Sequence, residues 1–130
     1  MALLMLAREA LSPAQLAQVE ERLALPVHRH DEGPTCTWRT SPAGMHAFFE
    51  PATGELVALA SGLGERRPGW WVDSAFRGQG YGGEVVDLIA ALLKSQGVTR
   101  VAPVMVATHQ HRYDQQSGKL LRRLYKHFER

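Results

Sequence analysis

The stretch Val72–Gly82, with the sequence VDSAFRGQGYG, is the most informative part of the chain because it joins a short apolar strand to a long helical pattern. Residues 70–73 are predicted to form the strand, and apolar residues repeat at helical spacing from Gly80 to Gln96. A strand-to-helix turn leaves several backbone N–H groups unpaired at the positive end of the helix dipole. Glycines at 78, 80 and 82 would let an anion approach that backbone closely. The stretch therefore predicts a phosphate or pyrophosphate site, without indicating which nucleotide carries it.

The glycines have three other interpretations. An ordinary tight turn needs one glycine, whereas three at alternate positions are costly at the start of a helix. A Rossmann dinucleotide site matches the string Gly78-x-Gly80-x-x-Gly83, but no clear βαβ repeat with a ribose-binding acid follows it. A P-loop is excluded because the turn contains no Gly-Lys-Ser or Gly-Lys-Thr.

An earlier helix has well-defined start signals. Ser12 is predicted to be its N-cap, Pro13 its first residue, and Gln15 the partner that completes a capping box. Leu11 and Leu16 occupy the two positions of a hydrophobic staple. Pro26 is predicted to end this helix.

The other segments complete a β-α-β-β-β-α-β-α order, which predicts an α/β or α+β fold with a mixed sheet flanked by helices. Thr35 to Arg39 could form a further short strand. The closing helix carries its apolar residues on one face, and the segments between elements are expected to be loops. The expected strands are 1–7, 45–50, 55–60, 70–73 and 99–106; the loops are 28–33, 62–69 and 107–117; the closing helix carries Leu121, Leu124, Tyr125 and Phe128.

Size and composition fit one soluble domain spanning residues 1–130. The chain is 45% hydrophobic and 22% charged, and no apolar run approaches the ~18 residues needed to cross a membrane. Its single cysteine, Cys36, excludes an internal disulfide and is expected to be a small buried residue rather than a nucleophile. These features favour a cytoplasmic protein.

Charge is distributed unevenly along the chain. Residues 1–93 hold 7 Lys/Arg and 11 Asp/Glu, a balance of −4, whereas residues 94–130 hold 8 Lys/Arg and 2 Asp/Glu, a balance of +6. The basic third could face a nucleotide phosphate or nucleic acid, or could be an ordinary solvated helix face. Nucleic-acid binding is disfavoured because Tyr125 and Phe128, the aromatic residues of the closing helix, lie on its apolar face.

The stretch from Val72 onward resembles the acetyl-CoA signature of the GNAT superfamily of N-acetyltransferases. Arg77, Gly80 and Gly82 occupy the three fixed positions of that signature, and the aromatic Phe76 agrees with it. The order of elements also resembles the family over nearly the whole chain. The resemblance implies that backbone amides of the turn bind the acetyl-CoA pyrophosphate, and that the preceding strand pairs with the pantetheine arm. The implied binding residues are Trp71, Val72, Asp73, Arg77, Gly78, Gln79, Gly80, Tyr81 and Gly82.

Leu124-Tyr125 resembles a Leu-Tyr pair on the last helix of the family, where the tyrosine hydroxyl protonates the departing CoA thiolate. The resemblance therefore implies that Tyr125 is the catalytic acid, although Tyr125 also fits plain packing on the apolar stripe. The chain departs from the family at three points. Gly118 stands where an asparagine is frequent, residues 69–71 offer no carboxylate base, and the chain stops at Arg130, before the usual closing hairpin.

A replacement base is expected after the strand predicted at residues 99–106. His109 is the principal candidate and His111 the second, because histidine titrates near neutral pH. The pairs His28-x-His30 and His109-x-His111 have a spacing that metal sites use, but no third and fourth ligands are well placed, so no metal site is predicted.

The leading expectation is an N-acetyltransferase that moves an acetyl group from acetyl-CoA to a primary amine of a small molecule or protein. One alternative is a catalytically weak acyl-CoA-binding module with a regulatory or assembly role, and a second is a nucleic-acid-binding protein. A homodimer is also expected, because residues 99–106 would present an apolar strand edge that a second copy could cover.

Overall fold

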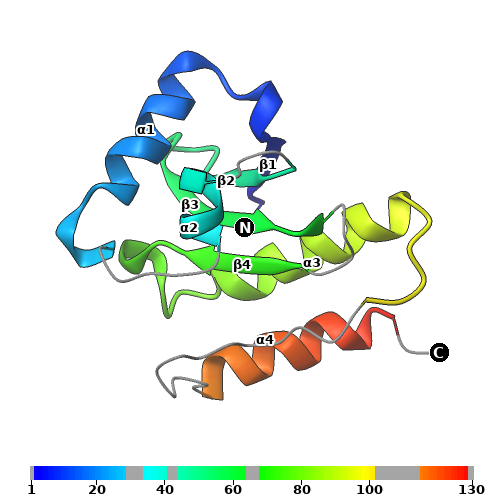
Figure 1. The fold of residues 1–130 in the computed structure, drawn as a ribbon. Coiled ribbons are helices and arrows are strands. Elements are labelled where there is room, and N and C mark those ends of the chain that lie inside the picture. Colours follow the sequence, from blue (N-terminus) through cyan, green and yellow to red (C-terminus); the bar gives the residue numbers. More distant parts are fainter. Residues whose placement is uncertain (1, 29–33, 41–43, 64–67, 102–114, 129–130) are drawn as a thin grey trace.

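A computed structural model describes residues 2–28, 34–40, 44–63, 68–101 and 115–128. Four strands form one sheet in the order β1-β2-β3-β4, and every pairing in it is antiparallel. Helices α1 and α2 cover one face of the sheet, α3 covers the other, and α4 lies beyond α3 (Figure 1). The α/β class expected from the sequence is confirmed. The strands are β1 (Leu4–Ala7), β2 (His46–Phe49), β3 (Leu56–Ser61) and β4 (Gly69–Val72), and the helices are α1 (Pro13–Leu23), α2 (Pro34–Thr40), α3 (Tyr81–Ser95) and α4 (Gln115–Lys126).

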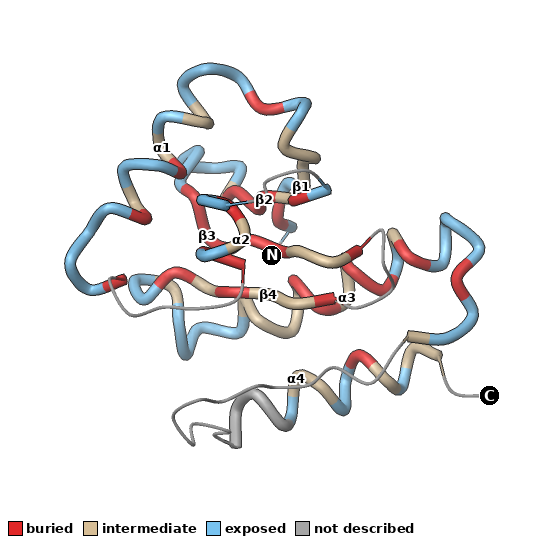
Figure 2. The backbone as a smooth tube through the Cα atoms, in the orientation of Figure 1, coloured by how far each residue is buried: buried red, intermediate tan, exposed pale blue. Residues whose placement is uncertain are grey.

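The sheet separates two apolar clusters, one on each face. Phe48, Val57 and Ile89 belong to the cluster under α3, and Val19 and Phe49 to the cluster under α1 and α2. Figure 2 shows this buried layer running through β2, β3 and α3. Because neighbouring residues of a strand point to opposite faces, the sheet gains a core on both sides.

The start of α1 forms as its sequence predicts. Ser12 Oγ accepts from the Gln15 N–H at 3.1 Å, and Gln15 Oε1 accepts from the Ser12 N–H at 2.8 Å, so both halves of the capping box are present. Further along α1, Gln18 donates to Gly54 O at 2.9 Å and accepts from the Leu56 N–H. The helix is thereby fixed to the hairpin between β2 and β3.

The strand suggested for Thr35 to Arg39 is wrong, because Pro34–Thr40 form helix α2. Pro34 begins this helix, where its missing N–H costs nothing. Thr35 and Trp38 are buried on one face at helical spacing, whereas Cys36 points to the other side and is exposed. The expectation of a buried Cys36 is therefore also wrong. Seven residues are too few for their apolar period to separate helix from strand.

Helices α3 and α4 lie side by side and run in the same direction (Figure 1). Arg123 of α4 donates twice to the Asp87 carboxylate of α3, at 2.9 and 2.6 Å, and His127 Nε2 lies 2.8 Å from Asp87 Oδ1. At the start of α3 a Cβ on Gly82 would lie 2.9 Å from Leu120, and one on Gly83 would lie 2.9 Å from Arg123. Gly82 and Gly83 therefore also let α4 pack closely against α3.

Several expectations fall on residues outside the described ranges. Residues 99–101 are described and are not a strand, while the rest of the strand expected at 99–106 lies outside. The expected dimer edge, the mixed character of the sheet, His109 and His111 depend on those residues and stay predictions. Among the described helices, none is both long and apolar enough to span a bilayer.

Candidate functional site

The segment between β4 and α3 is a turn in which glycine is required. A short 3-10 helix at Ser74–Phe76 leads from β4 into residues 77–80, which precede the first residue of α3. Gly78 has φ 76° and Gly80 has φ 86°, both in the left-handed region that side chains with a Cβ rarely adopt. The sequence therefore turns sharply here and presents its backbone at the start of a helix.

The start of α3 lacks the cap that α1 has. Gly80 is the N-cap residue and makes no side-chain cap hydrogen bond, whereas Ser12 and Gln15 cap α1 reciprocally. The first N–H groups of α3, at Tyr81, Gly82 and Gly83, have no intrahelical acceptor. This helix start is therefore suited to binding an anion, because the unpaired N–H groups and the positive end of the helix dipole are both located there.

Side chains of the turn hold its shape rather than fill the space in front of these amides. Gln79 Nε2 donates to Ala75 O at 2.9 Å. The Tyr81 hydroxyl donates to Glu50 Oε2 at 3.1 Å, and its ring meets Phe76 edge to face at 5.4 Å. Desolvation and the Glu50 carboxylate raise the pKa of the Tyr81 phenol, so it stays a hydrogen-bond donor at neutral pH.

A cavity of about 350 Å³ opens at this turn. Such a volume lies within the range of small-molecule sites, about 300–1,000 Å³. Aromatic and apolar side chains from β4 and α4 form one side of the cavity, and the glycine turn forms the other. Its described lining consists of Trp70, Trp71, Val72, Phe76, Arg77, Gly78, Gly80, Gly82, Gly83 and Leu120.

The backbone of β4 has one edge directed away from β3. Asp73 N–H donates to Val57 O at 2.8 Å, so the backbone groups of Asp73 and Trp71 face β3 in the antiparallel ladder. Those of Val72 and Trp70 face the opposite edge, where Arg77 Nε donates to Val72 O at 2.7 Å. Among the described residues, no strand pairs with β4 along that edge.

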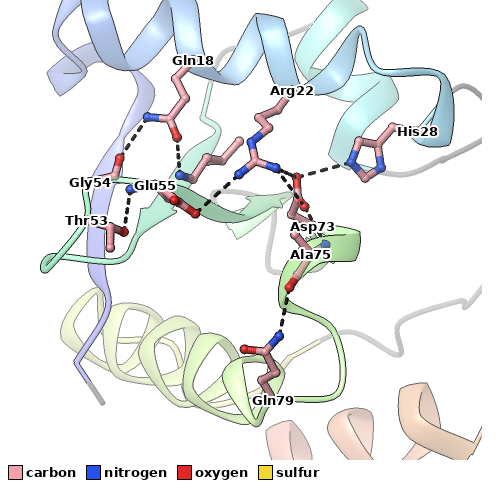
Figure 3. Close-up of polar contacts among 10 residues, drawn as sticks. Gln18, Arg22, His28, Thr53, Gly54, Glu55, Asp73, Ala75 and Gln79 are labelled. Carbon is pink, nitrogen blue, oxygen red and sulfur yellow. Dashed lines mark hydrogen bonds and ion pairs between the residues drawn. The ribbon is translucent and has the colours of Figure 1, made fainter.

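A buried carboxylate fixes the end of β4. Asp73 is fully buried and accepts from the Ala75 N–H at 2.9 Å, which caps the short 3-10 helix. Arg22 Nη1 of α1 lies 3.4 Å from Asp73 Oδ1, and His28 Nε2 lies 3.3 Å from Asp73 Oδ2 (Figure 3). The approach to the glycine turn is therefore held from the opposite face of the sheet.

The structure brings most of the sequence-predicted binding residues together. Trp71, Val72, Arg77, Gly78, Gly80 and Gly82 line one cavity, while Gln79 and Tyr81 brace the turn and Asp73 anchors it. Tyr125 is half-buried on α4 and is not among the described lining residues. His109 lies outside the described residues. The described residues contain no group of three His, Cys, Asp or Glu side chains that could hold a metal ion.

Sequence reasoning missed the partners of Asp73 and one wall of the cavity. The Asp-Ser-Ala sequence after β4 is a capping signal that could have predicted the Asp73–Ala75 bond. No local signal relates Asp73 to Arg22, which is 51 positions away. Leu120 precedes Leu124 by one helical turn, so its side of α4 was predictable, but its contact with Gly82 was not.

A strand, a glycine turn and an uncapped helix beside a cavity make this part of the protein suited to binding an anionic, nucleotide-like ligand. Comparison with known families then identifies the class of protein, because residues 8–116 match the Acetyltransferase (GNAT) family. The chain belongs to this family, whose members are acetyltransferases. No curated protein and no solved structure matches the chain.

Proposed function

We propose that this chain is an N-acetyltransferase that uses acetyl-CoA and a primary amine, on a small molecule or a protein. The observation that carries the proposal is the uncapped start of α3 beside a cavity that aromatic side chains and the glycine turn line together. A pyrophosphate would accept hydrogen bonds from the turn amides, and an acyl-pantetheine arm, which has both amide and apolar groups, would fit the mixed lining of the cavity. The family supports acetyl transfer in general, and the amine acceptor is our inference.

The outer edge of β4 is the proposed path of the pantetheine arm. Its amides would pair with the backbone groups of Val72 and Trp70, which face that edge, as an added strand would. Trp71 and Asp73 would support this path from the other face of the sheet, where the Trp71 ring packs edge to face with His28 at 4.9 Å and the Asp73 carboxylate anchors the end of β4. The arm would compete with Arg77 Nε for Val72 O, which accepts a hydrogen bond from that nitrogen at 2.7 Å.

The chemistry requires a nucleophile, an acid and a base. The neutral amine nitrogen attacks the thioester carbonyl carbon, the carbon–sulfur bond then breaks, and the thiolate takes up a proton while the nitrogen loses one. Tyr125 is the proposed proton donor to sulfur, and His109 the proposed acceptor of the amine proton. An N–H directed outward from β4, such as that of Val72, could stabilise the oxyanion.

A turnover assay with a panel of primary amines tests this proposal. Acetyl-CoA and protein are mixed with each amine, and the released CoA thiol and the acetylated product are both measured. Amine-dependent release of thiol with a matching amount of product is expected. Tight acetyl-CoA binding without turnover on any amine would instead show an acyl-CoA-binding module.

A further inference from the structure

A second cavity adjoins the turn on the side of α4. Its volume is about 640 Å³, and it shares Gly80, Gly83 and Leu120 with the cavity beside β4. A ligand lying across the turn could therefore extend from one cavity into the other without leaving the protein surface.

The α4 side of this second cavity is lined by cations. Lys119, Arg122, Arg123 and Lys126 all line it, and its described lining contains no carboxylate. Arg123 is held by Asp87 at 2.6 Å. Lys119, Arg122 and Lys126 are exposed, and no ion pair joins them to a carboxylate within the described part of the chain. Three cationic groups are therefore available to an anion there.

The orientation of α4 adds to this positive potential. Gly82 and Gly83 of α3 approach Leu120 and Arg123 of α4, and Asp87 meets His127, so the two helices run in parallel. Their N-terminal ends consequently lie at the same end of the pair (Figure 1), and both dipoles are positive there.

We infer that this cationic groove, defined by Lys119, Arg122 and Lys126, binds the 3′-phosphate of CoA and makes the protein discriminate CoA from 3′-dephospho-CoA. The inference rests on the proposed function. A phosphate monoester carries about −1.5 to −2 charge at pH 7, on oxygens that accept charge-assisted hydrogen bonds. It is attached to the adenosine end of CoA, beyond the pyrophosphate as seen from the pantetheine arm. With the arm at β4 and the pyrophosphate on the turn, that end reaches the groove.

The test compares CoA with 3′-dephospho-CoA by calorimetry on three proteins: wild type, Arg122→Gln/Lys126→Gln, and the control Lys94→Gln/Arg100→Gln. Both variants lose one lysine and one arginine, all four side chains are exposed, and the control pair lines neither cavity. Wild type and control should bind CoA roughly 5- to 10-fold more tightly than dephospho-CoA, the range expected for two or three exposed ion pairs. The groove variant retains Lys119, so it should bind CoA no more than about 2-fold more tightly than dephospho-CoA, as expected for one remaining exposed ion pair.

Each other result has a distinct meaning. If wild type binds both ligands equally, or the groove variant discriminates between them as strongly as wild type does, the inference is overturned while the proposed function stands. If wild type binds neither ligand, the proposed function fails as well. Binding of a uridine oligonucleotide is measured on the same three proteins. If Arg122 and Lys126 are needed for oligonucleotide binding but not for the discrimination between CoA and dephospho-CoA, the groove is a nucleic-acid surface and the inference is wrong.

Discussion

Gly78 and Gly97 have nearly the same backbone conformation in different surroundings. Their φ angles are 76° and 80°, and a Cβ on either would meet nothing within 4 Å. Gly78 lines the cavity at the turn, whereas Gly97 follows the end of α3. Alanine should therefore cost each position a similar conformational energy, about 1–2 kcal/mol.

The two alanine variants should differ in ligand binding. Gly78→Ala should weaken acetyl-CoA binding by roughly 5-fold or more, because its methyl group projects where the pyrophosphate must approach the backbone. Gly97→Ala should leave that affinity unchanged. Calorimetry measures the affinities and thermal melts the stabilities. If both variants bind acetyl-CoA with equal affinity, the ligand does not bind at the turn.

Tyr125 and Tyr81 provide a second contrast at the residue scale. Tyr125→Phe should lower kcat by roughly 10- to 10³-fold with little change in acetyl-CoA affinity, because it removes only the proposed acid. Tyr81→Phe removes the bond to Glu50 that braces the turn, so it should weaken acetyl-CoA binding more than it lowers kcat. Steady-state kinetics and calorimetry separate the two effects. If the Tyr125→Phe variant has the kcat of wild type, Tyr125 is a packing residue and not the acid.

Asp73 should be the most costly carboxylate to remove. Asp73→Ala removes the acceptor of the Ala75 N–H and of Arg22 Nη1, and the carboxylate that lies 3.3 Å from His28 Nε2, so we expect a loss of about 2–4 kcal/mol in the free energy of unfolding. Glu55→Ala is the matched control. It removes another carboxylate that lies 3.7 Å from Arg22, but this side chain is 51% exposed, so the loss should stay below about 1 kcal/mol. Urea unfolding measures both, and equal losses would contradict the assigned role of Asp73.

At the scale of elements, prediction succeeded where local chemistry decides the structure. The capping box at Ser12, the hairpin between β2 and β3 and the apolar period of α3 are local signals, and all three elements form. Helix α2 was missed because its seven residues are too few to show a period, and because Thr35 and Thr37 favour strands locally. Packing of Trp38 against the sheet decided that element instead.

The contact between α3 and α4 should depend on pH through Asp87. Hydrogen bonds from Arg123, opposed by desolvation and aided by His127, lower the Asp87 pKa to about 2 from an ordinary 3.8. A carboxyl whose pKa is lower in the folded state stabilises it fully above the unfolded value and ceases to do so as pH falls through the folded value. This contribution should therefore be present above about pH 4 and lost between about pH 4 and 2.

Asp87→Asn tests that dependence. The side chain is 37% exposed, so solvent screening limits the pair to about 1 kcal/mol or less. Urea unfolding at pH 6 should show wild type to be more stable than the variant by that amount, and the difference should shrink toward pH 2. A difference that is constant from pH 6 to pH 2 would mean that Asp87 does not titrate as described.

In the whole molecule, the turn itself was predictable from the sequence, whereas the contacts that hold it were not. The residues from Val72 to Gly82 carried both the turn and the family resemblance, and six of them line one cavity: Val72, Phe76, Arg77, Gly78, Gly80 and Gly82. The sequence could not show that Asp73 is anchored from α1, that Leu120 closes the cavity, or that α3 and α4 run in parallel. Those features arise from contacts between distant positions, which no local pattern encodes.

Two parts of the chain with opposite net charge meet at the cationic groove. The acidic part supplies the sheet, the turn and the carboxylate Asp87, and the basic part supplies α4 with Arg122 and Lys126. The groove between them exists because α4 is held on α3. Substitutions that detach α4 from α3 should therefore disrupt the second cavity while the sheet stays folded.

Amide hydrogen exchange by NMR, with and without acetyl-CoA, can show whether the ligand binds at the turn between β4 and α3, because it reports on individual backbone donors. Saturating acetyl-CoA should slow exchange at Gly80, Tyr81, Gly82 and Gly83, and at Val72 and Trp70 on the outer edge of β4, while the hairpin turn at residues 51–54 stays unchanged. Binding without protection at these amides would contradict the account, because the ligand would then lie somewhere other than the turn between β4 and α3.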